Sequence, residues 1–357
     1  MKSRIHPAHV AAVLGTAALI ITLAPPAHGQ GCPELVGRWT YGPTNAVAVS
    51  GSFAYFGSGT ALVEADVSDP ESPQVVGEVT FPGFVNGIAV SGTHAYIAAD
   101  TAGLRVVDIQ TPSAPVETGF VDTPGLARAV AVSGDYAYVA DEGGGLRVID
   151  VTTPSAPLEV GWVGALGTPE GVAVSGGYAY VASAGFIGVF YVIDISVPSA
   201  PVEVAYVPTG GDAWGVAVAG AYAFVAAASW NGSDYEGTLS VIDVSTPSTP
   251  AEVGSVFVGT SGTSARAVAI SRGYAYVTYD DYGIDGGLFV ADVSTPSAPL
   301  RVGFYETARN ATSVAASDGY VFVTTDGAGW YIFRECWLLF EDGFESGDTS
   351  AWSATVP

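Results

Sequence analysis

The sequence predicts an all-β protein, a seven-bladed β-propeller of four-stranded antiparallel blades whose last blade is closed by the N-terminal strand. Three observations support this prediction. A unit of about 40 residues recurs along the chain, each unit holds four short strand-like stretches, and the strand that the last unit lacks is found near the start of the chain. Repeats of this length with four strands are typical of propeller blades and not of helical solenoids.

The repeat is clearest between Ala129 and Val163, where four stretches are rich in β-branched and aromatic residues. They are separated by a Ser-Gly pair, a run of three glycines and a Thr-Pro-Ser-Ala-Pro segment. Strand-forming stretches divided by such turn residues predict a four-stranded antiparallel meander. The predicted strands are residues 130–132, 136–140, 146–151 and 158–163.

Seven copies of this unit follow one another. Their first strands share a valine-alanine-valine pattern with conservative exchanges, and their second strands alternate large aromatic with small residues. This alternation is expected where one face of a strand packs against the neighbouring blade. The first strands begin at Val47, Ile88, Val130, Val172, Val216, Val268 and Val314.

The third strand of each copy carries a common motif. Residues 104–108 are Leu-Arg-Val-Val-Asp, and residues 146–150 are Leu-Arg-Val-Ile-Asp. Together with the Pro-Ser-Ala-Pro turn that follows, they resemble the repeat of the bacterial LVIVD family. The resemblance covers residues 33–335 and implies a secreted or surface β-propeller, without implying a reaction. The seventh copy departs from the motif because it ends in Arg334 where the others have Asp.

The seventh copy also has no fourth strand after Cys336, whereas residues 33–39 match the fourth strand at residues 157–162. We expect this N-terminal strand to pair with the last blade and to remove both open sheet edges. Cys32 and Cys336 would then flank the one turn that is cut open. A disulfide between them is predicted, with a stabilisation of roughly 5 kcal/mol as an upper bound.

The two ends of the chain are expected to lie outside the propeller, which we assign to residues 30–339. Residues 1–29 have a positive start, an apolar stretch from Val10 to Leu23 and a break with small residues, which predicts a secretory signal peptide. The apolar stretch is too short to span a bilayer. Residues 340–357 form a short acidic tail, either a sorting or anchoring segment or a disordered end. The chain is therefore predicted to be secreted, periplasmic or on the bacterial cell surface.

The composition narrows the possible partners. The formal net charge is −24, and a chain this acidic repels nucleic-acid phosphates. Cation binding and simple solubility remain as explanations of the charge.

A set of dissimilar residues stands two positions before the first strands, where the central channel is expected to open. The next residue is always Ala, Gly or Ser, as crowding near an axis demands. We predict a pocket for a small polar or anionic ligand, with a solvated channel rim as the alternative. The seven residues are Asn45, Asn86, Arg128, Glu170, Trp214, Arg266 and Thr312.

The second turns lie on the same predicted face and vary between copies, while the other turns are nearly uniform. Variable loops on a fixed scaffold usually carry recognition. The longest second turn, residues 226–237, contains Trp230 and Tyr235, and we predict these aromatic residues, with Trp214, to form a contact surface.

Two groups of carboxylates are notable. Asp280, Asp281 and Asp285 lie in one second turn and could hold calcium, with a solvated acidic loop as the alternative. Asp100, Asp141 and Asp326 are candidates for a second cation site. Six further aspartates recur at one register, where we expect them to cap the following turn through backbone hydrogen bonds. These are Asp66, Asp108, Asp150, Asp194, Asp243 and Asp292.

Few residues suit catalysis, because the chain after residue 29 contains one histidine, His94, and no lysine. We therefore predict a non-catalytic scaffold without a required cofactor that binds a protein, glycan or small ligand. The alternative is a calcium-assisted hydrolase at the channel mouth that uses Arg128, Arg266 and Glu170.

Overall fold

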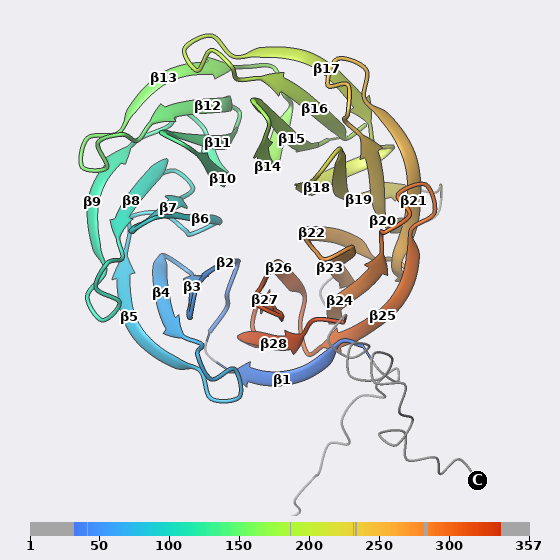
Figure 1. Ribbon diagram of the computed structural model, residues 1–357, viewed down its shortest axis with the longest axis horizontal. Helices are drawn as coiled ribbons and strands as arrows, with labels where there is room; N and C mark the ends of the chain where they lie inside the picture. Colours follow the sequence, from blue (N-terminus) through green and yellow to red (C-terminus); the bar gives the residue numbers. More distant parts are fainter. Residues whose placement is uncertain are drawn as a thin grey trace, which may run out of the picture.

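The computed structural model describes residues 32–40, 42–185, 187–230, 232, 234–281 and 285–336. In these residues the strands form seven four-stranded antiparallel sheets, and no helix is present. The sheets are arranged as blades around a central axis (Figure 1), which confirms the seven-bladed propeller. The predicted signal peptide at residues 1–29 and the acidic tail at residues 340–357 lie outside the described residues.

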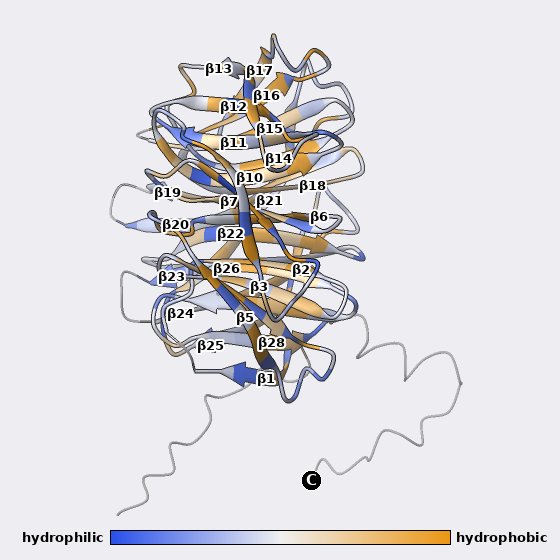
Figure 2. Cartoon of the chain, turned by 90° about the vertical axis from the view of Figure 1, so that its left-hand side faces the viewer, coloured by the Kyte–Doolittle hydropathy of each residue, from blue (hydrophilic) through white to orange (hydrophobic). Residues whose placement is uncertain are grey.

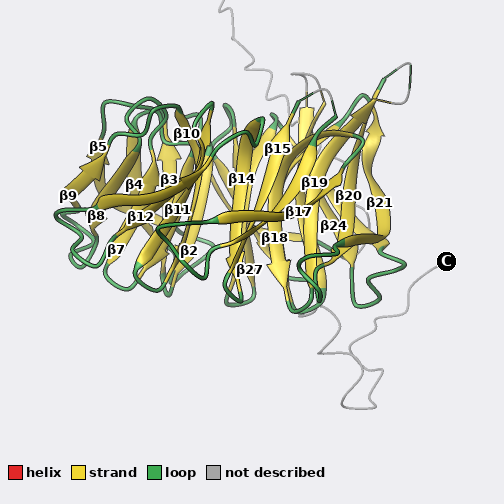
Figure 3. Cartoon of the chain, turned by 90° about the horizontal axis from the view of Figure 1, so that it is seen from above, coloured by secondary structure: helices red, strands yellow, loops and turns green. Residues whose placement is uncertain are grey.

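Each blade runs outward, with its first strand nearest the axis and its fourth strand at the rim (Figure 1). Blades 1 to 3 consist of β2 (Ala46–Ser50), β3 (Phe53–Ser58), β4 (Ala61–Asp66) and β5 (Gln74–Thr80); β6 (Gly87–Ser91), β7 (His94–Ala98), β8 (Leu104–Asp108) and β9 (Val116–Val121); and β10 (Leu126–Ser133), β11 (Tyr136–Glu142), β12 (Gly145–Asp150) and β13 (Leu158–Val163). Blades 4 to 6 consist of β14 (Thr168–Ser175), β15 (Tyr178–Ala184), β16 (Val189–Asp194) and β17 (Val202–Pro208); β18 (Gly211–Ala219), β19 (Tyr222–Trp230), β20 (Tyr235–Asp243) and β21 (Ala251–Ser261); and β22 (Ser264–Ser271), β23 (Tyr274–Asp281), β24 (Asp285–Asp292) and β25 (Leu300–Thr307). Blade 7 combines β26 (Ala311–Ser317), β27 (Tyr320–Thr325) and β28 (Trp330–Arg334) with β1 (Glu34–Trp39). The turns gather on the two flat faces of the ring (Figure 3).

The strands of blade 3 match the predicted repeat, except that the first strand begins earlier and the second strand, at Glu142, ends later than predicted. β10 begins at Leu126, four residues before the predicted start at Val130. Its pairing with β11 continues past a β-bulge between Ala127 and Ala129. The extension was not predicted because a bulge interrupts the two-residue alternation by which a strand is recognised.

The hydrophobic core lies between neighbouring blades. At the junction of blades 1 and 7, Phe56 stacks on Trp330 with ring centroids 4.2 Å apart, and Ile332 belongs to the same buried cluster. In a side view coloured by hydropathy, apolar segments run along the strands (Figure 2). Burial of each such side chain stabilises the fold by roughly 1.5–3 kcal/mol.

Glu64 is an exception within this core. It lies on β4 at the position that carries Val or Ile in the other six blades, and its side chain is fully buried. Neither carboxylate oxygen has a hydrogen-bond partner in the described structure. Burial raises the pKa of Glu64 to about 7, because a low-dielectric surrounding disfavours the charged form.

Circular closure occurs as predicted. β1 pairs with β28 in antiparallel register, with Leu35 opposite Phe333 and Gly37 opposite Ile332. A disulfide joins Cys32 to Cys336, whose Cα atoms are 5.4 Å apart. The described part of the chain contains no helix able to cross a membrane.

The six recurring aspartates cap the third turns. In each blade from 1 to 6 the aspartate Oδ1 accepts a hydrogen bond from the backbone N–H two residues later, at 2.8–2.9 Å. Hydrogen bonds favour the charged form. The side chain of Ser196 and then its backbone N–H lower the pKa of Asp194, and those of Ser245 do the same for Asp243, whereas for Asp66 the backbone N–H of Ser68 has the largest effect. The predicted structural role of these aspartates is confirmed.

Candidate functional site

A cavity of about 350 Å³ lies at the mouth of the central channel. Every blade contributes at least one residue to its wall, and the wall includes all seven residues that the repeat register places there. They are Asn45, Asn86, Arg128, Glu170, Trp214, Arg266 and Thr312. The structure therefore brings the whole predicted set together in one place.

β-Bulges explain how these side chains reach the axis. Arg128, Glu170, Trp214 and Thr312 each fall at a break in the pairing of the first and second strands of their blade. A bulge leaves one residue unpaired and changes the direction of its side chain. The predicted crowding is also present, because a Cβ added to Gly215 would lie 2.6 Å from the backbone oxygen of Arg266.

Arg128 is held by carboxylates. Its Nε donates to Glu142 Oε2 at 2.7 Å, and Nη2 makes a further short contact with the same oxygen. Asp100 lies 3.9 Å from Nη1, and Glu170 lies 3.8 Å from Nε. The positive charge that this arginine brings to the mouth is thus already compensated.

Arg266 has the same kind of partner. Its Nε donates to Asp280 Oδ2 at 2.7 Å, and its guanidinium lies over the ring of Trp214, 4.3 Å from the centroid. The indole Nε1 of Trp214 is buried and has no hydrogen-bond acceptor among the described residues. Arg266 thus orientates the indole ring of Trp214, which forms part of the cavity wall.

Glu170 is the least compensated charge of the seven. Its side chain is 18% exposed, and its nearest cationic atom is Arg128 Nε at 3.8 Å. Desolvation raises the pKa of Glu170 to about 7, against the opposing effect of Arg128. This carboxyl group changes its protonation state near neutral pH.

The remaining wall is polar. Asn86 Nδ2 donates to the backbone oxygen of Ala127 at 3.1 Å, and Thr312 Oγ1 donates to the backbone oxygen of Thr44 at 2.7 Å. Asn310 Nδ2 donates to Asp326 Oδ2 at 3.1 Å, and both residues line the cavity. The sequence analysis did not predict Asn310, because it precedes the repeating register.

The predicted calcium ligands do not meet at this mouth. Asp280 faces the channel cavity and pairs with Arg266, whereas Asp281 lines a different cavity. Asp285 begins β24, and its side chain is outside the described part of the structure. Among the described residues, no group of three or more His, Cys, Asp or Glu is arranged to hold a metal ion.

The three aspartates of the predicted second cation site, Asp100, Asp141 and Asp326, each interact with a different part of the protein. Asp141 is fully buried and accepts hydrogen bonds from Thr123 Oγ1 at 2.7 Å and from Gly125 N–H at 2.9 Å. Asp100 faces Arg128, and Asp326 accepts from Asn310. Each of these aspartates thus has a partner from the protein itself.

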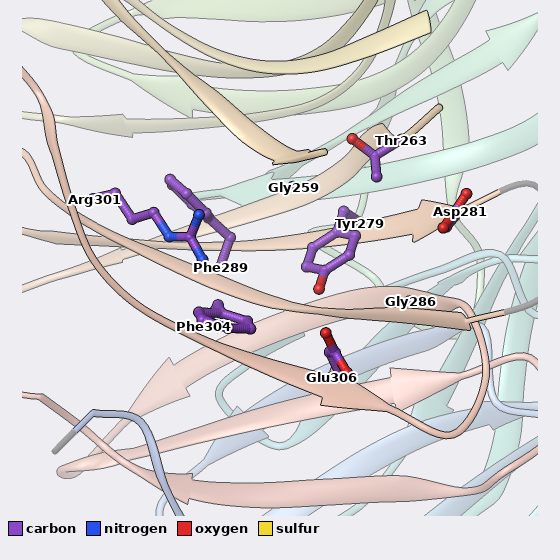
Figure 4. A pocket seen from close by; sticks show the side chains of 9 residues that line it. All are labelled: Gly259, Thr263, Tyr279, Asp281, Gly286, Phe289, Arg301, Phe304 and Glu306. Carbon is purple, nitrogen blue, oxygen red and sulfur yellow. The ribbon is translucent and has the colours of Figure 1, made fainter. Parts of the chain in front are cut away.

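The cavity that Asp281 lines was not predicted from the sequence. It has a volume of about 280 Å³. Figure 4 shows Arg301 and Phe304 on one side, Asp281 on the other, and Tyr279 between them. Arg301 lies over the Phe304 ring at 4.4 Å. Its walls come from β21, from Thr263 just before β22, and from β23, β24 and the rim strand β25, so no sequence motif joins them.

The aromatic insertion of blade 5 is an extended hairpin and not the long loop that was predicted. β19 and β20 keep their pairing as far as Trp230 and Tyr235, whose rings meet edge to face at 5.1 Å. Trp230 is 56% exposed. Neither residue lines the channel cavity, so they are separate from Trp214 as a contact surface.

The chain is similar to solved structures of low sequence identity, two of which are described as β-propeller domains. The computationally designed Ika8 protein has a TM-score of 0.59 and 13% identity, over 85% of this chain and 99% of that chain. The WD40 beta propeller domain of Doa1 has a TM-score of 0.66 and 13% identity, over 91% and 100%. The beta-propeller domain of Myceliophteria thermophila Cps50 (Swd1) has a TM-score of 0.67 and 11% identity, over 85% and 99%. At these identities the similarity shows the fold alone.

A comparison with curated proteins finds no match. The family model of the LVIVD repeat matches residues 41–80, 82–123, 124–164, 167–209, 210–258 and 262–307. These six segments correspond to blades 1 to 6, while blade 7, whose third strand ends in Arg334, is not matched. The chain belongs to the LVIVD repeat family.

Proposed function

We propose that the protein is an exported, non-catalytic binding scaffold that holds a protein, glycan or small ligand on the channel-mouth face of the propeller. One observation carries this proposal. Seven blades with nearly the same framework deliver seven side chains to one cavity, and these side chains differ in charge, size and hydrogen-bonding capacity. Diversity at one place on a repeated scaffold is typical of recognition.

The opposite face supports the same conclusion by contrast. There, six third turns share nearly the same sequence and the same aspartate cap. Uniform turns with internal hydrogen bonds serve the fold. The differences between blades are concentrated at the mouth.

Export is part of the proposal. A disulfide is a feature of oxidising compartments, and Cys32–Cys336 joins the two ends of the ring. Together with the LVIVD repeats, it supports a place outside the cytoplasm or on the cell surface.

The contacts at the mouth favour binding over the calcium-assisted hydrolase. Asp280 would be needed as a calcium ligand, but it is bonded to Arg266. A bound cation would have to displace that guanidinium. The arginines are likewise engaged with carboxylates and are not free to polarise a substrate.

The proposal can be tested by a thermal-shift screen of the exported chain against peptides, oligosaccharides and small polar molecules. Hits should be lost in Trp214→Ala and Arg266→Ala and kept in Trp162→Ala, a matched change of an exposed tryptophan at the rim. Hits that survive both mouth variants, or that are lost in the rim variant, would contradict the proposal.

A further inference from the structure

The channel mouth holds more negative than positive charge. Two guanidinium groups are present, together with six carboxylates. Each carboxylate either lines the cavity or lies next to a residue that lines it. The carboxylates are Asp100, Glu142, Glu170, Asp212, Asp280 and Asp326. Because both arginines are already paired, no free cation remains for an anionic ligand. The structure thus disfavours the anionic ligand that was one expectation from the sequence.

The repeat shows why Glu170 has no close ion-pair partner within its own blade. Arg128 pairs with Glu142 and Arg266 pairs with Asp280, each fourteen residues later on the second strand of the same blade. In blade 4 the equivalent position is Ala184, which lies opposite Thr168 in the pairing of β14 with β15. The hairpin that carries Glu170 therefore offers it no charged group, and Glu170 makes no hydrogen bond within the described residues.

The neighbouring blades compensate Glu170 only in part. Blade 3 contributes Arg128, which favours the charged form, and Glu142, which opposes it. Blade 6 contributes Arg266, and blade 5 contributes Asp212, whose Oδ1 accepts from Gly185 N–H at 2.7 Å. Burial has the largest effect on the pKa of Glu170 and raises it, and Arg128, which has the next largest effect, lowers it.

We propose that the channel mouth binds the primary ammonium group of an organic cation, with Glu170 as its ion-pair partner. An ammonium group supplies the positive charge and the three donors that a partly buried carboxylate lacks. The cavity of about 350 Å³ has room for an alkyl ammonium chain.

This inference rests on the proposed function and adds the chemistry of the ligand. It also predicts linkage to pH. Because the cation pairs with the ionised carboxylate and the pKa of Glu170 is about 7, affinity should rise about tenfold from pH 6 to pH 8. At pH 7 binding should release about half a proton per site.

Titration calorimetry of the exported chain with five probes tests the inference. Nα-acetyl-lysine methylamide and butylammonium carry the ammonium group. Nα-acetyl-norleucine methylamide and 1-butanol are their neutral counterparts. Nα-acetyl-glutamate methylamide is the anionic probe. The two cations should bind at least about tenfold more tightly than their neutral counterparts. Tighter binding of the lysine derivative would identify a peptide side chain as the source, and equal binding would indicate recognition of the ammonium alone.

Glu170→Gln should remove this preference and make the remaining affinity independent of pH. Glu203→Gln, on the outer strand β17 of the same blade, is the matched control. It should change neither the preference for cations nor the pH dependence of their affinity. Calorimetry of the unaltered chain in two buffers of different ionisation heat reports proton release directly, so the conclusion does not depend on a variant.

Two outcomes separate this inference from the proposed function. Binding of the glutamate derivative or a neutral probe, lost in Trp214→Ala, would keep the binding site and overturn the cation. Absence of binding by every probe, or pH dependence that persists in Glu170→Gln, would overturn the cation inference. The thermal-shift screen would still decide the proposed function.

Discussion

At the residue scale, Glu64 shows how one polar substitution changes the stability of a repeated core. The other blades place Val or Ile at this position, and in blade 1 Tyr55 on β3 lies opposite Glu64 and opposes the effect of burial on its pKa. Burying a carboxyl group without hydrogen bonds costs little free energy when the group is the neutral acid and much more when it is the anion. Glu64 should therefore make the fold sensitive to pH.

The direction of this effect follows from the pKa of Glu64, which is raised from 4.5 to about 7 in the folded state. Below pH 4.5 both folded and unfolded chains carry the acid, and the residue has no pH-dependent cost. As the pH rises from 4.5 through 7, the unfolded chain loses the proton more easily, and the free energy of unfolding falls. The full loss, above pH 7, is on the order of 3 kcal/mol.

Glu64→Val should remove this loss. Chemical denaturation at pH 5 and pH 8 should show a gain in the free energy of unfolding at pH 8 and little gain at pH 5. Glu78→Val, an exposed change on β5 of the same blade, is the control. Equal effects of Glu64→Val at the two pH values would contradict the expected titration.

At the scale of the element, the third and fourth strands share an arginine motif. In blades 2 and 3 the arginine stands on the third strand, pairs with a glutamate on the fourth, and covers an aromatic ring at the rim. For Arg147 the partners are Glu159 at 3.3 Å and Trp162 at 5.3 Å. In blade 6 the arginine stands on the fourth strand instead of the third, and Arg301 lies over the ring of Phe304 on the same strand. The same contact between cation and ring is built from either strand.

Arg147→Ala should destabilise the protein by about 3 kcal/mol, because Arg147 Nε also lies 3.5 Å from the fully buried Asp141. Denaturation by urea measures the change. Arg301→Ala is the matched control, since Arg301 has no ion pair among the described residues, and it should cost less than about 1 kcal/mol. A small effect of both variants would show that the carboxylate of Asp141 does not depend on Arg147.

The hairpin of β23 and β24 yields a prediction about calcium. Asp280 and Asp281 face different cavities, and Asp280 is paired with Arg266. Millimolar calcium, or EDTA, should therefore shift the melting temperature by no more than about 1 °C. Elemental analysis of the purified chain is the companion measurement. A large calcium-dependent stabilisation would favour the hydrolase alternative.

At the scale of the whole molecule, circular closure converts a row of blades into a ring without exposed sheet ends. β1 supplies the rim strand of blade 7, and the disulfide replaces the covalent turn that every other blade has between its third and fourth strands. The bridged cysteines are 304 residues apart. Closing so long a loop restricts the unfolded chain strongly.

Replacing both cysteines by serine should lower the free energy of unfolding by up to about 5 kcal/mol. Denaturation with and without a reducing agent measures this loss, and mass spectrometry of non-reduced peptides checks the bond. The reduced native chain and the double variant should behave alike. Two free thiols in the native protein, or no change on reduction, would exclude the disulfide as the fastening of the ring.

The number of blades, their strand order, the closing strand and the cysteine pairing all follow from the sequence. They do so because the unit is repeated, so that one interpreted copy sets the register of the others and reveals what the last copy lacks. The same register places Arg128, Glu170 and Trp214 at the mouth, since each occupies one position of the repeat.

The electrostatic balance of that mouth depends instead on contacts formed in the folded protein. The partners of Arg128 and Arg266 lie across a bulged strand pair, and the bulge alters which side chains meet in a way that spacing does not reveal. The separation of Asp280 from Asp281 has a related cause, because adjacent residues of a strand point to opposite faces, whereas the sequence suggested a loop. Charge compensation and burial depend on contacts between strands and between blades, and for this reason the weak charge compensation of Glu170 emerged only from the folded ring.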